Sequence, residues 1–201
     1  MKLIGMLDSP YVRRVAISLR ALDIPFEHEA VSVFRHFDAF KAINPVVKAP
    51  TLVLDDGTTL MDSSLILDFL ETLAGRSLLP AAPAPRAQAL RVVGLALALC
   101  EKAVQIVYEK ELRPQDKQHA PWLERVRYQL HAACSELETE LARRPLGEGA
   151  AIGQDGISLA VAWGFAQRVI RDELEPAGYP SLAAFAERAE RLPAFLATPM
   201  A

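Results

Sequence analysis

The chain has 201 residues and a formal net charge of −3, with 51% hydrophobic and 23% charged residues. This balance is typical of a globular protein with one large or two small domains, and it excludes a largely disordered chain. The acidic balance argues against a nucleic-acid-binding protein, because such proteins need an excess of Lys and Arg along one face.

The first part of the chain alternates strand patterns with helical ones. Apolar residues spaced three or four apart predict helices, and short apolar or alternating runs predict strands. In chain order we expect a strand at 1–7, a helix at 9–22, a half-buried strand at 26–33, a short helix at 38–43, strands at 51–54 and 59–61, and a helix at 63–73. The first three elements form a βαβ unit, which implies parallel strands joined by a right-handed crossover. Asp56-Gly57 favours a hairpin between the last two strands.

A proline-rich segment at 80–85 separates this part from a second one that is helical throughout. Three prolines in six residues favour an extended chain, so we interpret the segment as a linker. Beyond it we expect helices near 86–112, 121–143, 158–173 and 181–191. The sequence therefore predicts an N-terminal domain over 1–79 and an all-helical C-terminal domain over 86–201.

The cysteines and the apolar runs bear on the compartment. Cys100 and Cys134 lie far apart in helical patterns, and we interpret them as reduced core thiols. The four histidines show no metal-ligand spacing. The N-terminus has no apolar segment followed by a cleavage site, and the most apolar run, 92–100, is about half the length that spans a bilayer. We expect a cytoplasmic protein without a metal or a membrane segment, and the excess of Arg over Lys suggests a bacterial source.

Ser9 and Pro10 stand where the first strand pattern gives way to a helix. Serine is a preferred N-cap and proline is favoured at the first helical position, so capping alone accounts for the pair. The same place suits an anion, because the helix dipole and the free N–H groups favour negative charge there. A thiolate beside the Ser9 hydroxyl would be stabilised, as cysteines at helix N-termini are.

Two further motifs allow both a structural and a functional interpretation. Ala49-Pro50 precedes a strand, where an ordinary trans proline suffices, whereas a cis bond would present the N–H and C=O of Ala49 to an extended ligand. Asp62 and Ser63 precede the next helix, and capping alone explains them too. The Ser63 hydroxyl and the helix N–H groups also suit a carboxylate, and Asp62 suits an ammonium group. An α-amino acid head group presents both charges.

Three motifs in this order, within a βαβαββα domain, resemble the glutathione-binding domain of the glutathione S-transferase superfamily. They are Ser9-Pro10-Tyr11-Val12-Arg13-Arg14-Val15, Lys48-Ala49-Pro50-Thr51-Leu52 and Asp62-Ser63-Ser64-Leu65-Ile66. The first looks most like the serine-type members, such as the plant Tau class and related bacterial proteins. The resemblance covers the whole chain and implies an α/β plus all-α fold, with a thioredoxin-like N-terminal domain and an all-helical C-terminal domain. It also implies a homodimer.

The resemblance implies a transferase that conjugates glutathione to small, largely apolar electrophiles in detoxification. Ser9 would hydrogen-bond the glutathione sulfur and favour its thiolate. Ala49 would pair through its backbone with the cysteinyl part, ahead of a cis Pro50. Asp62 and Ser63 would bind the γ-glutamyl ammonium and carboxylate. The remaining site residues implied are Lys48 at the glycyl carboxylate, Phe34 in the bordering loop 33–36, and Tyr11, Glu101, Val104, Tyr108 and Trp163 around the electrophile.

Alternatives stay open beside this hypothesis. Thiol–disulfide exchange needs a cysteine at the helix start, where this chain has Ser9 and Val12. A non-catalytic binding or scaffold protein would keep the fold, although such relatives usually lose part of the glutathione site. A glutathione-dependent isomerase is a further alternative, although its Zeta-class members carry a Ser-Ser-Cys-like start. Where relatives carry Ser/Thr-x-x-Asp, an N-capping box, we align Ser158 and Val161, so that half of the box is missing.

Overall fold

A computed structural model of the chain describes residues 1–200, apart from the side chain of Ala150. It divides into two compact units. One comprises Met1–Leu78 together with the residues from Leu192 onward, and the other comprises Leu79–Arg191. The sequence assigned the residues after 192 to the C-terminal helices, whereas in the structure they pack on the N-terminal unit. Their contacts with this unit include Arg13, whose Nε donates to the carbonyl of Thr198 over 2.8 Å and whose guanidinium lies over the ring of the buried Phe195.

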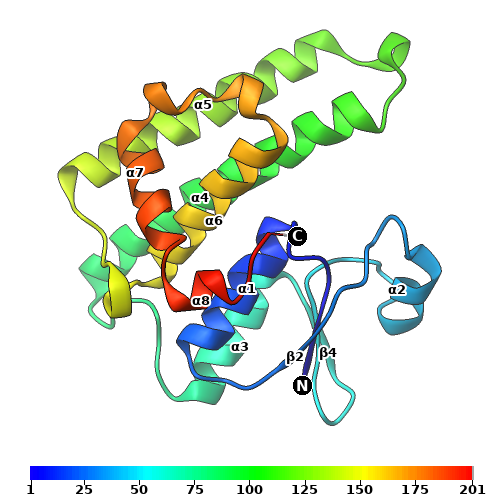
Figure 1. Ribbon diagram of the computed structural model, residues 1–201, viewed down its shortest axis with the longest axis vertical. Helices are drawn as coiled ribbons and strands as arrows, with labels where there is room; N and C mark the ends of the chain where they lie inside the picture. The colour runs from blue at the N-terminus through cyan, green and yellow to red at the C-terminus, as the bar shows by residue number, and fades with distance from the viewer. Residues whose placement is uncertain (201) are drawn as a thin grey trace. The chain divides into compact units, whose positions relative to one another are not determined.

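The N-terminal unit has the predicted βαβαββα order (Figure 1). Its elements are β1 (Lys2–Ile4), α1 (Pro10–Ala21), β2 (Glu27–Glu29), α2 (Phe37–Ile43), β3 (Thr51–Val53), β4 (Thr59–Met61) and α3 (Ser63–Ala74), with the short α8 (Pro193–Leu196) packed on α1. The strands form one sheet in the order β2-β1-β3-β4. β1 and β2 are parallel, and the other neighbours are antiparallel. The predicted crossover is therefore present, followed by the predicted hairpin.

One strand differs from its predicted character. All three residues of β2 are exposed, so that the expected half-buried strand is wrong. β2 is an edge strand of the sheet. Its alternating pattern therefore marks the extended backbone, while the apolar contacts are made by residues flanking the strand, such as Phe26 and Val31.

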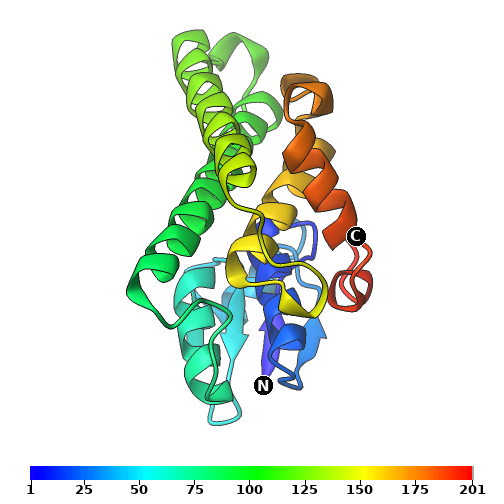
Figure 2. The same cartoon turned by 90° about the vertical axis from the view of Figure 1, so that its left-hand side faces the viewer.

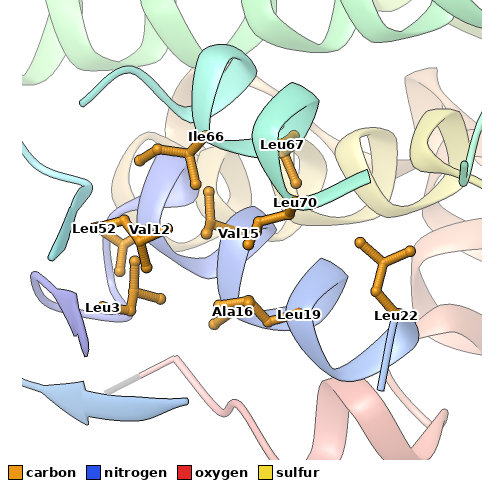
Figure 3. Close-up of a cluster of buried hydrophobic side chains, with 10 residues drawn as sticks. All are labelled: Leu3, Val12, Val15, Ala16, Leu19, Leu22, Leu52, Ile66, Leu67 and Leu70. Atoms are coloured by element: carbon orange, nitrogen blue, oxygen red, sulfur yellow. The ribbon is translucent and has the colours of Figure 1, made fainter. Parts of the chain in front are cut away.

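Successive residues of β1 point to opposite faces of the sheet and enter different clusters. Leu3 belongs to the larger core, in which the apolar faces of α1 and α3 meet each other and the sheet (Figure 3). Ile4 packs on the other face with Val31 and Phe40. The larger cluster consists of Leu3, Val12, Val15, Ala16, Leu19, Leu22, Leu52, Ile66, Leu67 and Leu70. Burying each large apolar side chain contributes about 1.5–3 kcal/mol, and together these contacts hold α1 and α3 against each other and the sheet.

The second unit is helical, as predicted. It contains α4 (Pro83–Glu111), α5 (Ala120–Arg143), α6 (Gln154–Val169) and α7 (Pro180–Ala189), with 3₁₀ turns at Gln115–Lys117, Gly149–Ala151, Arg171–Glu173 and Pro176–Gly178. α4 and α5 lie side by side as a long antiparallel pair (Figures 1 and 2). In the described part of the chain, none of the helices combines the length and apolarity needed to cross a membrane.

α4 begins at Pro83, inside the segment predicted to be an extended linker. The N–H groups of a helix's first turn have no intrahelical acceptor, so prolines there cost no hydrogen bond. Pro83 occupies the first helical position, and Pro85 follows within the same turn. The prolines at 83 and 85 therefore lie in the first turn of a helix, and only residues 80–82 of the predicted linker precede that helix.

α6 begins at Gln154, four residues before its predicted start. The N-cap is Gly153, which has no side chain to cap with, and Asp155 in the first turn accepts the N–H of Gly156 over 2.9 Å. Ser158 lies inside the helix and accepts from Gln154, so it is not the capping residue we aligned. Every residue from Gln154 to Trp163 is buried, which removes the polar face that marks a helix start in a sequence.

Cys134 on α5 is fully buried, and burial, with the nearby Glu138 carboxylate, raises the pKa of its thiol to about 12. We expect no alkylation of Cys134 by iodoacetamide at pH 8 in the folded protein, because the thiolate is the reactive form. Labelling in denaturant is the control that shows that the thiol itself is competent. Peptide mass spectrometry after both treatments measures the modification, and rapid labelling of Cys134 in the folded state would contradict the prediction.

Candidate functional site

The strand register brings the three predicted motifs to one edge of the sheet. Thr51 is the partner of Ile4 in the β1–β3 pair and of Met61 in the β3–β4 pair. The chain leaves β1 at Ile4 toward Ser9, enters β3 from Ala49-Pro50, and leaves β4 at Met61 toward Asp62 and Ser63. Antiparallel pairing of β3 with both neighbours therefore brings Ser9 together with two segments that lie 40 and 53 residues further along the sequence.

Ser9 is the N-cap of α1, with Pro10 at the first helical position, as the sequence predicts. The N–H of Val12 donates to Ser9 Oγ over 3.5 Å, which is long compared with the usual 2.9–3.0 Å. The serine is half-buried, and the first turn of α1 carries no acidic side chain. In this bond the hydroxyl only accepts, so its hydrogen is available to an anion that binds at the N-terminus of the helix.

The Ala49–Pro50 bond is cis, the second of the two conformations considered for it. In the described part of the chain, neither the N–H nor the C=O of Ala49 takes part in a hydrogen bond. Gly5, at φ 136°, lies directly against this segment: a Cβ on Gly5 would come within 2.6 Å of Val12 Cγ2 and 3.2 Å of the Ala49 Cβ. The close approach of β1, α1 and Ala49 therefore requires a glycine at this position.

Two buried polar residues that the sequence did not single out hold this segment. Asn44 Nδ2 donates to Thr51 Oγ1 over 2.9 Å, and Thr51 Oγ1 donates to the carbonyl of Lys48 over 2.8 Å. Asn44 Oδ1 also accepts the N–H of Val46 over 3.0 Å. The signal was present in Asn44-Pro45, because asparagine before proline favours a turn closed by its own side chain.

Asp62 caps α3 from an uncommon backbone conformation, with φ at 71°. Non-glycine residues rarely adopt this region, although aspartate does so more readily than most. Its Oδ1 accepts the N–H of Ser64 over 2.9 Å, and its Oδ2 lies 3.7 Å from Lys48 Nζ. Both side chains of this pair are about half exposed, so the pair contributes little to stability and stays accessible to a charged ligand.

Ser63, the first residue of α3, is almost fully buried. Its hydroxyl accepts a hydrogen bond from the buried guanidinium of Arg14 on α1, over 3.1 Å. Sequence patterns did not indicate this contact, because the two residues lie 49 positions apart. The helical pattern of α1 also does not depend on which polar residue occupies position 14.

The comparisons with known proteins agree with this geometry. A family model described as the glutathione S-transferase N-terminal domain matches residues 3–78. A glutathione S-transferase from Methylobacterium radiotolerans, solved in complex with glutathione sulfonate, is 30% identical with a TM-score of 0.90, covering 100% of this chain and 95% of that chain. The chain belongs to the glutathione S-transferase superfamily.

Two further relatives show the spread of the superfamily. Glutathione S-transferase U6 of Arabidopsis thaliana is 28% identical over 153 residues, 76% of this chain and 65% of that protein. A maleylacetoacetate isomerase of Methylobacterium extorquens AM1, solved with bound malonate and GSH, is 25% identical with a TM-score of 0.74, covering 98% of this chain and 95% of that chain. The predicted thioredoxin-like plus all-helical fold of a glutathione S-transferase is therefore confirmed.

The other predicted site residues of the N-terminal unit lie near its loops. Tyr11 is a half-buried residue of the first turn of α1. Phe34 follows β2 in a loop organised by Ser32, whose hydroxyl accepts the N–H groups of Phe34 and Arg35. The ring of Phe34 is 58% exposed. Such an apolar ring, held by an ordered backbone, suits contact with a ligand.

The helical unit places its candidates in two different settings. Glu101, Val104 and Tyr108 follow one another along one side of α4, where Tyr108 is 45% exposed and partial burial raises its pKa. Glu101 Oε1 accepts from Lys102 and Gln105. Trp163, in contrast, is 4% exposed and packs edge-to-face on Tyr179, 5.9 Å between ring centroids, so its setting is that of a core residue. Among the described residues, no group of three or more His, Cys, Asp or Glu is arranged to hold a metal ion.

Proposed function

We propose that this glutathione S-transferase superfamily member binds glutathione at the edge of the sheet and conjugates its thiolate to small, largely apolar electrophiles. The observation that carries the proposal is the meeting of Ser9, Ala49 and Asp62-Ser63 at one sheet edge through the register of Ile4, Thr51 and Met61. The four groups offer a hydroxyl donor, a free backbone pair, a carboxylate and a second hydroxyl. These match the thiol, the peptide and the amino-acid head group of glutathione.

The binding roles follow from the chemistry of each group. The N–H and C=O of Ala49 suit pairing with the cysteinyl peptide unit of an extended tripeptide. Asp62 suits the γ-glutamyl ammonium, and the Ser63 hydroxyl at the N-terminus of α3 suits the γ-glutamyl carboxylate. Lys48 is proposed to release Asp62 and meet the glycyl carboxylate, while Phe34 covers one side of the peptide.

The catalytic step rests on Ser9. A free thiol with a pKa of about 8.5 is only a few per cent thiolate at pH 7. Donation from the Ser9 hydroxyl and the positive end of α1 stabilise the thiolate, and each unit by which the thiol pKa falls corresponds to about 1.4 kcal/mol. The thiol proton passes to solvent as the thiolate forms. A sulfur lone pair then forms the C–S bond, and the leaving group departs with the electron pair of its own bond to carbon, so no protein base is needed. Tyr11 is proposed to contact the electrophile, and the same role for Glu101, Val104 and Tyr108 stays a prediction from the resemblance.

A second candidate is a glutathione-dependent isomerase. It is favoured by the similarity to the maleylacetoacetate isomerase solved with malonate and GSH. In such a reaction the thiolate adds to a cis double bond and leaves again after rotation, so that glutathione is regenerated. Ser9 would hold the thiolate in the same way in both reactions.

Glutathione binding and turnover of two substrate types test the proposal. We expect glutathione to bind in titration calorimetry and to be consumed in conjugation with a chromogenic aryl halide. Isomerisation of a maleyl compound without loss of thiol would favour the second candidate. Binding without either reaction would indicate a scaffold protein, and no binding would overturn the proposal. The homodimer implied by the resemblance and the cytoplasmic location expected from the cysteines and apolar runs stay predictions. The mass in gel filtration tests the homodimer.

A further inference from the structure

A buried cation lies against the N-terminus of α3. Arg14, in the second turn of α1, is 3% exposed, and its Nη1 donates to Ser63 Oγ over 3.1 Å and to Ser64 Oγ over 3.3 Å. Ser63 is 4% exposed. One guanidinium therefore contacts both hydroxyls that begin this helix, while Asp62 holds the N–H of Ser64.

This contact determines what the Ser63 hydroxyl does. A guanidinium has only donors, so the serine oxygens must accept in both bonds. A hydroxyl has a single hydrogen, and with its oxygen turned to Arg14 that hydrogen points away from the cation. Ser63 is thereby oriented as a donor, and the nearby positive charge favours an acceptor that is an anion. A neutral acceptor would gain only the hydrogen bond, and a cationic group would gain from neither effect.

We propose that Arg14 is a positioning residue that orients the Ser63 hydroxyl toward the γ-glutamyl carboxylate of glutathione. The inference rests on the proposed function, since it assumes that glutathione is the ligand. Arg14 acts through Ser63 and sets the preference of the site for a carboxylate at the amino-acid head group.

The neighbouring Arg13 provides a matched control. It is also buried on α1, but its guanidinium bonds the carbonyl of Thr198 and lies 5.6 Å from the Phe195 ring centroid. Arg13 thus secures the C-terminal segment, and Arg14 secures the start of α3. Replacing either removes one buried guanidinium from the same helix, but only Arg14 contacts Ser63 in the way the proposal needs.

The test compares glutathione with an analogue that lacks the γ-glutamyl α-carboxylate, 4-aminobutyryl-Cys-Gly. Titration calorimetry measures both affinities for the full chain and for Arg14→Gln, Arg14→Lys and Arg13→Gln. We expect Arg14→Gln to weaken glutathione binding about ten- to hundredfold while the affinity for the analogue changes less than about threefold. Arg13→Gln should lower the melting temperature and leave the ratio of the two affinities unchanged.

Arg14→Lys keeps the buried charge without the fork of donors, so it covers the case in which Arg14→Gln does not fold. It should retain part of the preference for glutathione, and Ser63→Ala added to Arg14→Lys should remove that remaining part. Equal weakening of both ligands by the Arg14 variants, or a parent protein that binds both ligands equally, would overturn the inference. A parent protein that binds neither ligand would instead overturn the proposed function.

Discussion

Ser9→Ala is expected to lower kcat/KM for conjugation about ten- to hundredfold at pH 7, with a smaller effect on the Kd for glutathione. The alanine removes the hydroxyl that donates to the sulfur at the N-terminus of α1. The pKa of the bound glutathione thiol should therefore rise by one to two units, and each unit corresponds to about 1.4 kcal/mol. The thiolate absorbance of the complex, followed against pH, measures that pKa directly. The pH profile of kcat/KM should shift upward by the same amount.

Two variants separate this effect from helix capping, because alanine also removes the cap, at about 1 kcal/mol. Ser9→Thr keeps a hydroxyl and should keep most of the activity. Ser9→Asp caps the helix but carries no hydrogen to donate when ionised, so the fold should remain while the thiol pKa rises. Full activity in Ser9→Asp, or an unchanged thiol pKa in Ser9→Ala, would contradict the assigned role.

Gly5→Ala is expected to destabilise the protein by about 2–6 kcal/mol, the largest loss of stability that we predict for a single substitution. The new Cβ would meet Val12 Cγ2 at 2.6 Å in the core and crowd Ala49, and the φ of 136° is strained for any L side chain. Overpacking costs about 1–3 kcal/mol and such a backbone conformation a similar amount. Urea unfolding measures the loss, and glutathione affinity should fall with it because Ala49 is displaced.

Two glycines in open surroundings serve as controls for this substitution. Gly57, at φ 86°, has no atom within 4 Å of the point that an added Cβ would occupy, so Gly57→Ala should show the backbone cost alone, about 1 kcal/mol. Gly94 lies in α4, also in open space, and Gly94→Ala should stabilise the protein by roughly 0.5–1 kcal/mol. A loss for Gly5→Ala no larger than that for Gly57→Ala would show that the contact with Val12 and Ala49 can relax.

Several elements of the fold depend on interactions between residues close in sequence, and these elements could be predicted. Ser9-Pro10 marked a helix start because capping acts within one turn, and the Asp-Gly turn marked a hairpin because its preference is built into two residues. Apolar periodicity located α1 and α3. α3 buries one face only, and α1, although buried on all sides over Val12–Leu19, carries Arg13, Arg14 and Ser18 between its apolar residues, so a period is visible in both sequences. The order of elements and the superfamily followed from these features.

Prediction was wrong where the environment of a segment, and not its own composition, determines its state. α6 is buried on all sides over Gln154–Trp163, so its start left no change in polarity to detect. The prolines at 83 and 85 are compatible with both a linker and a first helical turn. The residues of α4 that follow are packed as a helix, and the two prolines form its first turn. The residues from Leu192 onward join the N-terminal unit, where Phe195 is buried and the carbonyl of Thr198 accepts from Arg13, 185 positions away in the sequence.

The sequence by itself determined which groups are available for glutathione: a hydroxyl at a helix start, a peptide unit before a proline, and an acidic residue beside a serine. Only the tertiary structure decided that they meet, through the pairing of β3 with β1 and β4, and that Arg14 contacts Ser63. The physical reason is range. Caps and turns involve bonds within a few residues, whereas the β1–β3 register and the buried guanidinium of Arg14 join groups almost 50 residues apart, so no local pattern in the sequence indicates them.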